Sequence, residues 1–188
     1  MILPKYSEFC SRVKTISGDK VLEKIPAMLA GMNATRPMIM TDKGVVAAGL
    51  IDIVKKAMGA RMKIGAIYDG VPVDSDYRVV NDAAAVYRKK GCDSLITVGG
   101  GSAIDTAKGV NILVSLGGDD LLHYVGAGSV RKKLNPHIVI PTTSGTGSEV
   151  GRSSVVSEND THLKRVVFSA KILAKTVFAD PELTFGLP

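Results

Sequence analysis

A run of three glycines stands directly after an apolar segment at residues 94–98: Gly99, Gly100 and Gly101. Glycine lacks a Cβ, so the backbone there can turn sharply and a ligand can approach it closely. A helix expected over residues 103–116 would direct its free N–H groups and the positive end of its dipole at that ligand. The pattern therefore favours a phosphate or pyrophosphate site, with the Ser102 hydroxyl as a further donor. The alternative is a tight turn in which Ser102 caps the helix and no ligand is bound.

The residues that follow separate this loop from two common phosphate-binding motifs. Ile104 stands where G-x-G-x-x-G requires its third glycine, and the G-K-[ST] of a Walker A loop is missing. Asp105 lies one turn into the expected helix, where two interpretations stay open. It either complements the dipole of the first turn or lies beside a cofactor or substrate.

A second polar loop follows the apolar segment at residues 137–140. Residues 141–150 (PTTSGTGSEV) carry five hydroxyl side chains and two glycines, and the threonines are Thr142, Thr143 and Thr146. Short hydroxyl donors on a flexible backbone suit ribose, amide or phosphate groups. The alternative is a polar surface loop with local side-chain turns. No G-x-S-x-G motif occurs in the chain, which disfavours a serine hydrolase.

An acidic residue, Asp42, ends a third apolar segment at residues 37–40. A carboxylate at a strand end can accept hydrogen bonds from ribose hydroxyls and repel a 2′-phosphate. In the usual dinucleotide fingerprint this acid follows the glycine loop, whereas here it precedes it. From the residues alone, a helix N-cap is therefore the stronger interpretation of Asp42.

The elements that must position these loops alternate between strand and helix. Continuous apolar strands alternating with helices predict an α/β fold, a parallel sheet covered by helices on both faces. Ligands of such sheets bind beyond the carboxyl ends of the strands, which is where the three polar segments lie. A small β-hairpin is expected around Asn159-Asp160. The expected strands are 12–17, 37–40, 62–68, 94–98, 137–140, 155–157, 166–168 and 176–179, and the expected helices are 19–32, capped by Asp19, 44–59, 77–90 and 103–116, with another beginning at Asp180-Pro181.

Composition narrows the class of protein further. The chain has 188 residues, of which 45% are hydrophobic, a length and composition typical of one globular domain. The net charge of +6 comes from small basic groups without interleaved aromatic residues, which disfavours nucleic-acid binding. No apolar run approaches the ~20 residues that span a bilayer, and no signal peptide is evident, so we expect a cytoplasmic protein. Two distant cysteines and three scattered histidines predict neither a disulfide framework nor a metal site made by this chain alone.

Three segments together resemble the iron-containing (group III) alcohol dehydrogenases. They are the glycine loop with Asp105, residues 141–150, and residues 180–184 (DPELT). The segments 41–43 (TDK) and 68–71 (YDGV) occur in the order expected for that family, and the resemblance covers about residues 10–188. It implies a Rossmann-like N-terminal domain that binds NAD(P), followed by a C-terminal helical domain that binds a divalent metal, iron or zinc. Residues 1–188 are expected to form the NAD(P)-binding domain, with a linker starting at about 180–188.

The resemblance also assigns roles to individual residues. The loop from Gly99 to Ser102 matches the segment that holds the pyrophosphate, and Asp42 matches an acid that contacts the adenosine ribose and favours NAD over NADP. The threonines of residues 141–150 match the lining of the adenosine and nicotinamide-side pocket, and Lys164 matches a lysine near the nicotinamide ribose. Residues 73–76 (VDSD) depart from the usual Pro-Asn-Pro-Thr, so no cofactor contact is assigned to Asp74.

The activity implied by the resemblance is metal-dependent hydride transfer between a small alcohol or aldehyde and NAD(P). The metal ligands of the family lie downstream of the last residue here, so the helical metal domain is expected to be absent and no residue is assigned as catalytic or metal-binding. The chain is therefore expected to be inactive alone and to bind NAD weakly. The alternatives are a non-catalytic NAD-binding or oligomerising module and a relative similar to glycerol dehydrogenases or dehydroquinate synthase. A homo-oligomer is expected from the edge strand near the N-terminus and from apolar residues expected to be exposed, namely Phe178, Leu183, Phe185 and Leu187.

Overall fold

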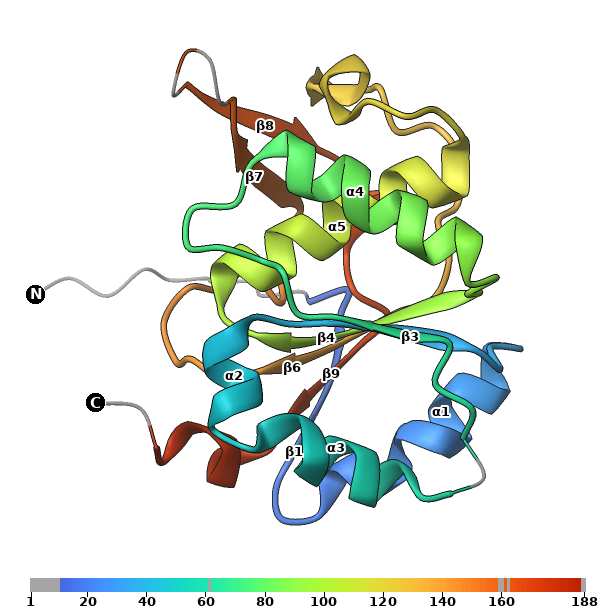
Figure 1. Cartoon of the computed structure of the whole chain (residues 1–188), viewed down its shortest axis with the longest axis vertical. Helices are drawn as coiled ribbons and strands as arrows, with labels where there is room; N and C mark the ends of the chain where they lie inside the picture. The colour runs from blue at the N-terminus through green and yellow to red at the C-terminus, as the bar shows by residue number, and fades with distance from the viewer. Residues whose placement is uncertain (1–10, 61, 159–160, 162, 187–188) are drawn as a thin grey trace, which may run out of the picture.

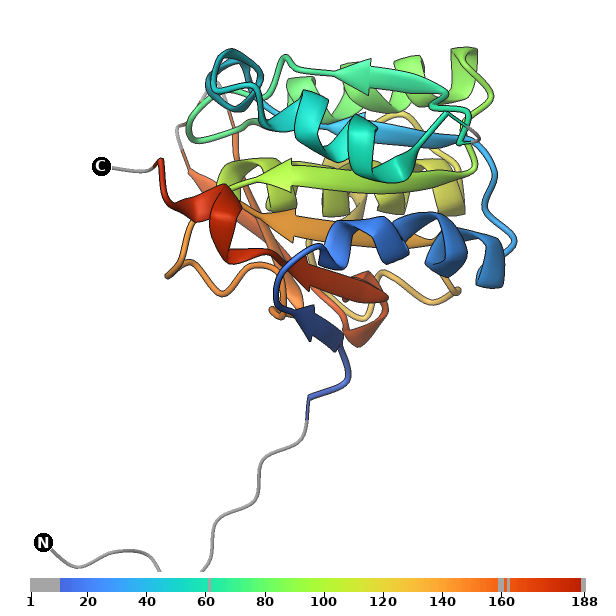
Figure 2. The same ribbon diagram turned by 90° about the horizontal axis from the view of Figure 1, so that it is seen from below.

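The computed structural model describes residues 11–60, 62–158, 161 and 163–186. Its centre is a six-stranded sheet in which all the neighbouring strands run parallel. Figure 2 shows β1 at one edge of this sheet and β3 at the other. The order of strands is β1 (Lys14–Ser17), β9 (Thr176–Ala179), β6 (His137–Pro141), β4 (Ser94–Gly99), β2 (Pro37–Met40) and β3 (Ala66–Tyr68).

Helices cover both faces of the sheet, as the alternating pattern predicts (Figure 1). On one face lie α1 (Ile25–Gly31), α2 (Lys43–Ala47) and α3 (Leu50–Met58), and on the other lie α4 (Tyr77–Lys89) and α5 (Gly101–Leu116). Successive residues of a strand point to opposite faces. Met38 and Leu95 therefore join the core under α4 and α5, whereas Ile39 and Ile96 join the core under α1 and α3. The predicted α/β fold with a Rossmann-like parallel sheet is confirmed.

The order of the strands determines where a ligand can enter. Strands β2 and β4 are neighbours, but the chain leaves β2 for α2 on one face and leaves β4 for α5 on the other. Such a reversal opens a crevice beyond the carboxyl ends of the two strands. Asp42 and the three glycines lie at this crevice, each directly after its strand.

A second, three-stranded sheet lies beyond α5 (Figure 1). It consists of β5 (Gly126–Ala127), β8 (Lys164–Phe168) and β7 (Ser153–Ser157), and β7 pairs antiparallel with β8. This pair is the predicted hairpin, although its expected turn at Asn159-Asp160 lies outside the described residues. Four short 3₁₀ helices complete the fold: η1 (Val21–Lys24), η2 (Leu121–Tyr124), η3 (Ala170–Ile172) and η4 (Pro181–Thr184).

Several predicted boundaries are wrong. The helix expected from residue 19 starts as η1 and follows Lys20, which has a left-handed φ of 55°, so Asp19 is not its cap. The helix expected over 44–59 is broken between α2 and α3 at Gly49, whose φ of 75° a larger residue would adopt only with strain. The strand expected from residue 62 forms only at Ala66–Tyr68. Helix α5 begins two residues earlier than expected, so Gly100 and not Ser102 occupies the capping position.

The expectation that the C-terminal apolar residues are exposed is wrong for two of them. Phe178 and Leu183 are buried with Ile25 in the core under α1 and α3. Phe185 is 77% exposed, and Leu187 lies outside the described residues. Asp180 caps η4 by accepting a hydrogen bond from the N–H of Glu182 at 3.1 Å, which confirms the start of a helical turn there. Within the described part of the chain, no helix has the length and apolar character needed to cross a bilayer.

Candidate functional site

A large cavity of about 930 Å³ opens at the crevice beyond β2 and β4. Six segments line it: the start of α2, residues 48–50, residues 69–73, the glycine loop, the loop after β6, and η4 with the residues that follow it. Its walls are mostly apolar, with Val45, Leu50, Val71 and Leu183 among them. Seven of the predicted site residues meet here: Asp42, Gly100, Gly101, Ser102, Thr142, Thr143 and Thr146.

The three glycines pack closely against α5 and the loop after β6 and leave little room for side chains. Gly99 has a φ of 154°, and a Cβ on it would lie 2.8 Å from the Cβ of Ala103. A Cβ on Gly100 would lie 3.2 Å from Thr143, and one on Gly101 would lie 3.2 Å from Thr146. The missing side chains therefore leave backbone exposed to the cavity at the start of α5.

The start of α5 leaves hydrogen-bond donors available to a ligand. No side chain caps this helix, and its first backbone bond runs from the N–H of Ile104 to the carbonyl of Gly100 at 3.1 Å. The N–H groups before Ile104 have no partner within the helix, and the helix dipole adds positive potential there. Beside them the Thr143 hydroxyl is buried and has no hydrogen-bond partner among the described residues. Unpaired groups of this kind fit a bound pyrophosphate.

Asp42 is the N-cap of α2, the stronger of the two interpretations that the sequence allowed, and its contact with a ribose stays a prediction. Its Oδ1 accepts a hydrogen bond from the N–H of Val45 at 2.9 Å, which confirms it as the N-cap of α2. Its Oδ2 is directed toward the glycine loop, because a Cβ on Gly99 would lie 3.5 Å from that oxygen. One carboxylate oxygen therefore caps the helix, while the other lies near the glycine loop, and Asp42 as a residue lines the cavity.

A smaller polar cavity of about 110 Å³ lies on the other side of the glycine loop. It shares Gly101 and Ser102 with the large cavity, so the start of α5 separates the two. Asp105 and Lys164 line this smaller cavity and not the large one. The Nζ of Lys164 lies 3.3 Å from an oxygen of Asp74, and both side chains are more than half exposed.

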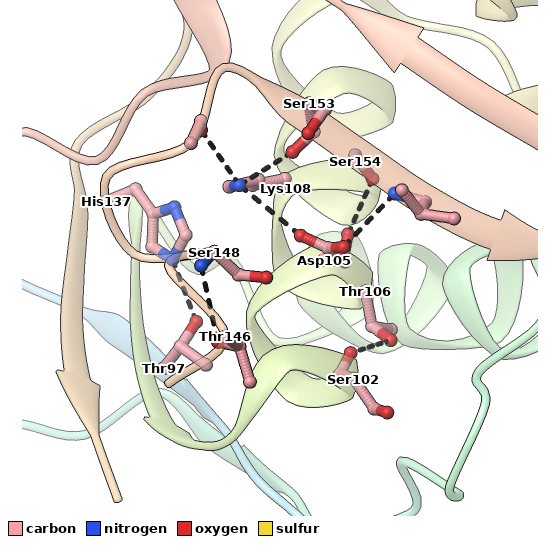
Figure 3. A network of polar contacts seen from close by, with 12 residues as sticks. Thr97, Ser102, Asp105, Thr106, Lys108, His137, Thr146, Ser148, Ser153 and Ser154 are labelled. Carbon is pink, nitrogen blue, oxygen red and sulfur yellow. Dashed lines mark hydrogen bonds and ion pairs between the residues drawn. The ribbon is translucent and has the colours of Figure 1, made fainter. Parts of the chain in front are cut away.

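Asp105 contacts the hairpin rather than only the helix dipole (Figure 3). One carboxylate oxygen lies 3.3 Å from the Nζ of Lys108, and the other accepts a hydrogen bond from the N–H of Val155 at 3.3 Å. Burial raises the pKa of Asp105, and the neighbouring Lys108 cation opposes that rise. The interpretation of Asp105 as a residue that only complements the helix dipole therefore did not include its contacts with Lys108 and Val155.

The comparisons with known proteins agree with this geometry. A family model described as iron-containing alcohol dehydrogenase matches residues 13–181. The chain belongs to the iron-containing alcohol dehydrogenase family. It is 44% identical to a 4-hydroxybutyrate dehydrogenase of Cupriavidus necator over 81% of this chain and 40% of that protein.

Solved structures of this family have the same fold. An alcohol dehydrogenase from Oenococcus oeni matches with a TM-score of 0.88 and 32% identity, over 97% of this chain and 48% of that one. A sulfoacetaldehyde reductase from Bifidobacterium kashiwanohense, solved in complex with NAD+, matches with a TM-score of 0.85 and 26% identity, over 98% of this chain and 49% of that one. This family member therefore spans less than half the length of these relatives, and it corresponds to the Rossmann-like N-terminal domain.

The described residues of this family member do not fit the iron site that the family name implies. No group of three or more His, Cys, Asp or Glu side chains among them is placed to hold a metal ion. His137 is buried in β6 with its Nε2 2.8 Å from the hydroxyl of Thr97, and burial lowers its pKa to about 3. His123 lies in η2 and is also outside any such group.

Sequence reasoning missed one functional-site neighbour, Lys108. Its side chain is fully buried and it lies on α5 one turn after Asp105. Every residue of this iron-containing alcohol dehydrogenase from Thr106 to Leu113 is buried, and Lys108 is the charged member of that stretch. A lone lysine in an apolar helical segment was the available signal, because a buried ammonium requires built-in acceptors.

Proposed function

We propose that this chain is the cofactor-binding domain of a metal-dependent alcohol dehydrogenase, which transfers hydride between a small alcohol or aldehyde and NAD(P). The observation that carries the proposal is the uncapped start of α5 beside the unpaired Thr143 hydroxyl, among the residues that line a cavity of about 930 Å³. Cavities of this size hold cofactors, and their few polar groups orient the ligand. The domain assignment to residues 1–188, with a linker from about 180, is part of the same proposal.

The chain's own residues bind and orient the dinucleotide. The N–H groups of Gly101 and Ser102 donate to the pyrophosphate, and Thr143 supplies a further hydroxyl donor. The apolar wall that includes Val71 and Leu183 packs against the adenine. A bound nicotinamide would supply the hydride acceptor for the reaction, and the protein's contribution is to hold the ring in one orientation.

NAD is the preferred cofactor in this proposal. Asp42 lines the cavity and its Oδ2 lies near the glycine loop. In this proposal that oxygen accepts hydrogen bonds from the ribose hydroxyls and repels the 2′-phosphate of NADP. The sulfoacetaldehyde reductase relative contains NAD+, which supports the same choice. The smaller cavity, with Lys164 and Asp105, takes the nicotinamide riboside, because it continues from the shared Ser102.

Isothermal titration calorimetry of the chain with NAD+, NADP+ and ADP tests the proposal. We expect NAD+ and ADP to bind and NADP+ to bind about tenfold more weakly than NAD+, a difference of about 1.4 kcal/mol. Absence of binding by all three nucleotides would overturn the proposal. Alcohol oxidation by the chain alone is expected to be undetectable, since no described residue is placed to activate the alcohol oxygen.

We also propose that the chain pairs with a second copy through β1. This strand lies at an edge of the main sheet, and Lys14, Thr15 and Ser17 on it are exposed. An exposed edge strand offers unpaired N–H and C=O groups to another chain. Light scattering at micromolar concentration is expected to give the mass of a dimer, and a uniform monomer would contradict this pairing.

A further inference from the structure

The buried Lys108 of α5 makes hydrogen bonds to a different part of the chain, at the start of the hairpin. Its Nζ donates to the carbonyl of Gly151 at 3.0 Å and to the carbonyl of Ser153 at 2.7 Å, and it lies 3.3 Å from Asp105. An ammonium group has three N–H donors, so these three acceptors use all of them (Figure 3). Two of the acceptors belong to the backbone that leads into β7. The cation therefore ties α5 to the hairpin.

Two further hydrogen bonds join the same parts of the chain. Asp105 accepts from the N–H of Val155, and the hydroxyl of Ser154 donates to the backbone carbonyl of Asp105 at 2.8 Å. Each of these hydrogen bonds between the first residues of β7 and α5 uses a side chain, and Val156 adds apolar packing in the core that α5 also lines. This matters because β7 and β8 belong to the small sheet and are not strands of the main one.

The hairpin carries one wall of the smaller cavity. Val155 and Ser157 of β7 and Lys164 of β8 face Ser102 and Asp105 of α5 across that cavity. Lys108 does not line it. Whether Lys164 faces Ser102 depends on where the hairpin docks, and Lys108 supplies two of the bonds that determine this docking.

We infer that Lys108 is a positioning residue for dinucleotide binding. It fastens the hairpin to α5, so that Lys164 and Asp105 lie together at the half of the site beyond the pyrophosphate. This inference rests on the proposed function. It predicts that loss of Lys108 weakens binding of the nicotinamide half of NAD+ while leaving the adenosine half, on the far side of the glycine loop, bound as before.

Calorimetry with two probes separates positioning from a general effect on folding. ADP contains only the adenosine and pyrophosphate part, whereas NAD+ extends into the smaller cavity. For Lys108→Met, which keeps the length of the side chain and removes the charge, we expect NAD+ affinity to fall about tenfold and ADP affinity to change less than about twofold. The exposed Lys89→Met on α4 is the matched control and is expected to change neither.

A double-mutant cycle tests whether Lys108 acts through the hairpin. Lys164→Met is expected to weaken NAD+ binding, and adding Lys108→Met should bring less than about a twofold further loss, because both changes disable the same contact. Losses that multiply would overturn the inference. Equal losses for ADP and NAD+ in Lys108→Met would also overturn it, since they would indicate a purely structural role.

Ser154→Ala is the variant to use if Lys108→Met does not fold. It removes one hydrogen bond between hairpin and helix and leaves the lining of the smaller cavity intact. We expect a loss of about threefold for NAD+ and none for ADP. No loss for NAD+ would contradict the inference. Failure of the wild-type chain to bind either probe would overturn the proposed function first, and the positioning role with it.

Discussion

The first two turns of α5 differ in whether their polar groups have hydrogen-bond partners in the protein. In the first turn, at Gly101 and Ser102, backbone donors have no partner within the helix and no side chain caps them. In the second turn, Lys108 is fully buried beside the partly buried Asp105, and every N–H of the ammonium has an acceptor. One helix thus has backbone donors that are left open to a ligand and a cation whose donors are all used by the protein itself. Unpaired groups at a cavity indicate binding, whereas fully paired buried charges indicate positioning of other parts of the chain.

The largest expected effect is on the free energy of unfolding of Lys108→Met, which tests the second turn. Removing one member of a buried ion pair leaves the other unpaired, which costs about 3–5 kcal/mol in the free energy of unfolding. For a domain of this size that corresponds to a fall in Tm of roughly 6–20 °C by calorimetry. Lys89→Met should stay within about 0.5 kcal/mol of wild type. A loss below about 1 kcal/mol for Lys108→Met would show that the donors of this cation are not used as described.

Gly100→Val tests the open turn. Gly100 has extended backbone angles that valine accepts, but the added side chain would crowd Thr143 and cover the donors at the start of α5. We expect NAD+ affinity to fall on the order of 100-fold, or about 2.7 kcal/mol, together with a lower Tm because valine crowds Thr143. Gly100→Ala should give an intermediate loss. Unchanged NAD+ binding by the valine variant in calorimetry would remove the glycine loop from the proposed site.

The pH dependence of stability tests the buried polar region behind the second turn. Burial lowers the pKa of folded His137 to about 3, whereas an unfolded histidine titrates near 6.5. The unfolded state therefore binds the proton first, and stability is lost as the pH falls through the window between these two values. Between pH 7 and pH 5 the expected loss is about 2 kcal/mol in urea unfolding.

A pair of histidine variants serves as the control for this pH dependence. His137→Leu should reduce the slope between pH 7 and pH 5, while the exposed His123→Gln should keep it. An identical slope in all three proteins would show that other groups cause the acid sensitivity.

The smallest expected effect concerns Asp42, which serves both the helix and the cavity. Serine keeps the N-cap and removes the charge, so Asp42→Ser should retain stability and shift the preference from NAD+ toward NADP+ about tenfold. Asp42→Ala should show the same shift and in addition lose about 1 kcal/mol of stability, because the cap is gone. Nucleotide titrations and urea unfolding measure the two parts. If serine and alanine destabilise equally, the hydrogen bond to Val45 does not contribute.

Local sequence patterns predicted the main sheet and its loops well. Apolar runs bounded by glycine or polar residues placed β2, β4, β6 and β9 within one residue of their observed bounds. The segments that follow these strands also meet as expected, since carboxyl ends of parallel strands share one edge of a sheet. The contacts of the predicted residues with a cofactor stay predictions.

Features that depend on distant contacts could not be read from the sequence. The acceptors of Lys108 are the backbone carbonyls of Gly151 and Ser153, which no side-chain pattern reveals. The contacts of Asp105 with Lys108 and with the N–H of Val155 also depend on where the hairpin packs, so residue spacing alone left two interpretations of Asp105. Phe178 and Leu183 looked like an exposed surface because their burial depends on α1, far away in the chain.

The edge position of β1 also bears on how the chain folds as it is synthesised. Lys14 pairs with Thr176, so one of the first described segments to leave the ribosome waits for one of the last. At translation rates of about 5–20 residues per second, the wait is on the order of ten seconds. During that time β2, β3, β4 and β6 can already pair, while β1 has no neighbour. The nascent chain therefore depends on keeping Lys14–Ser17 from pairing elsewhere until β9 arrives.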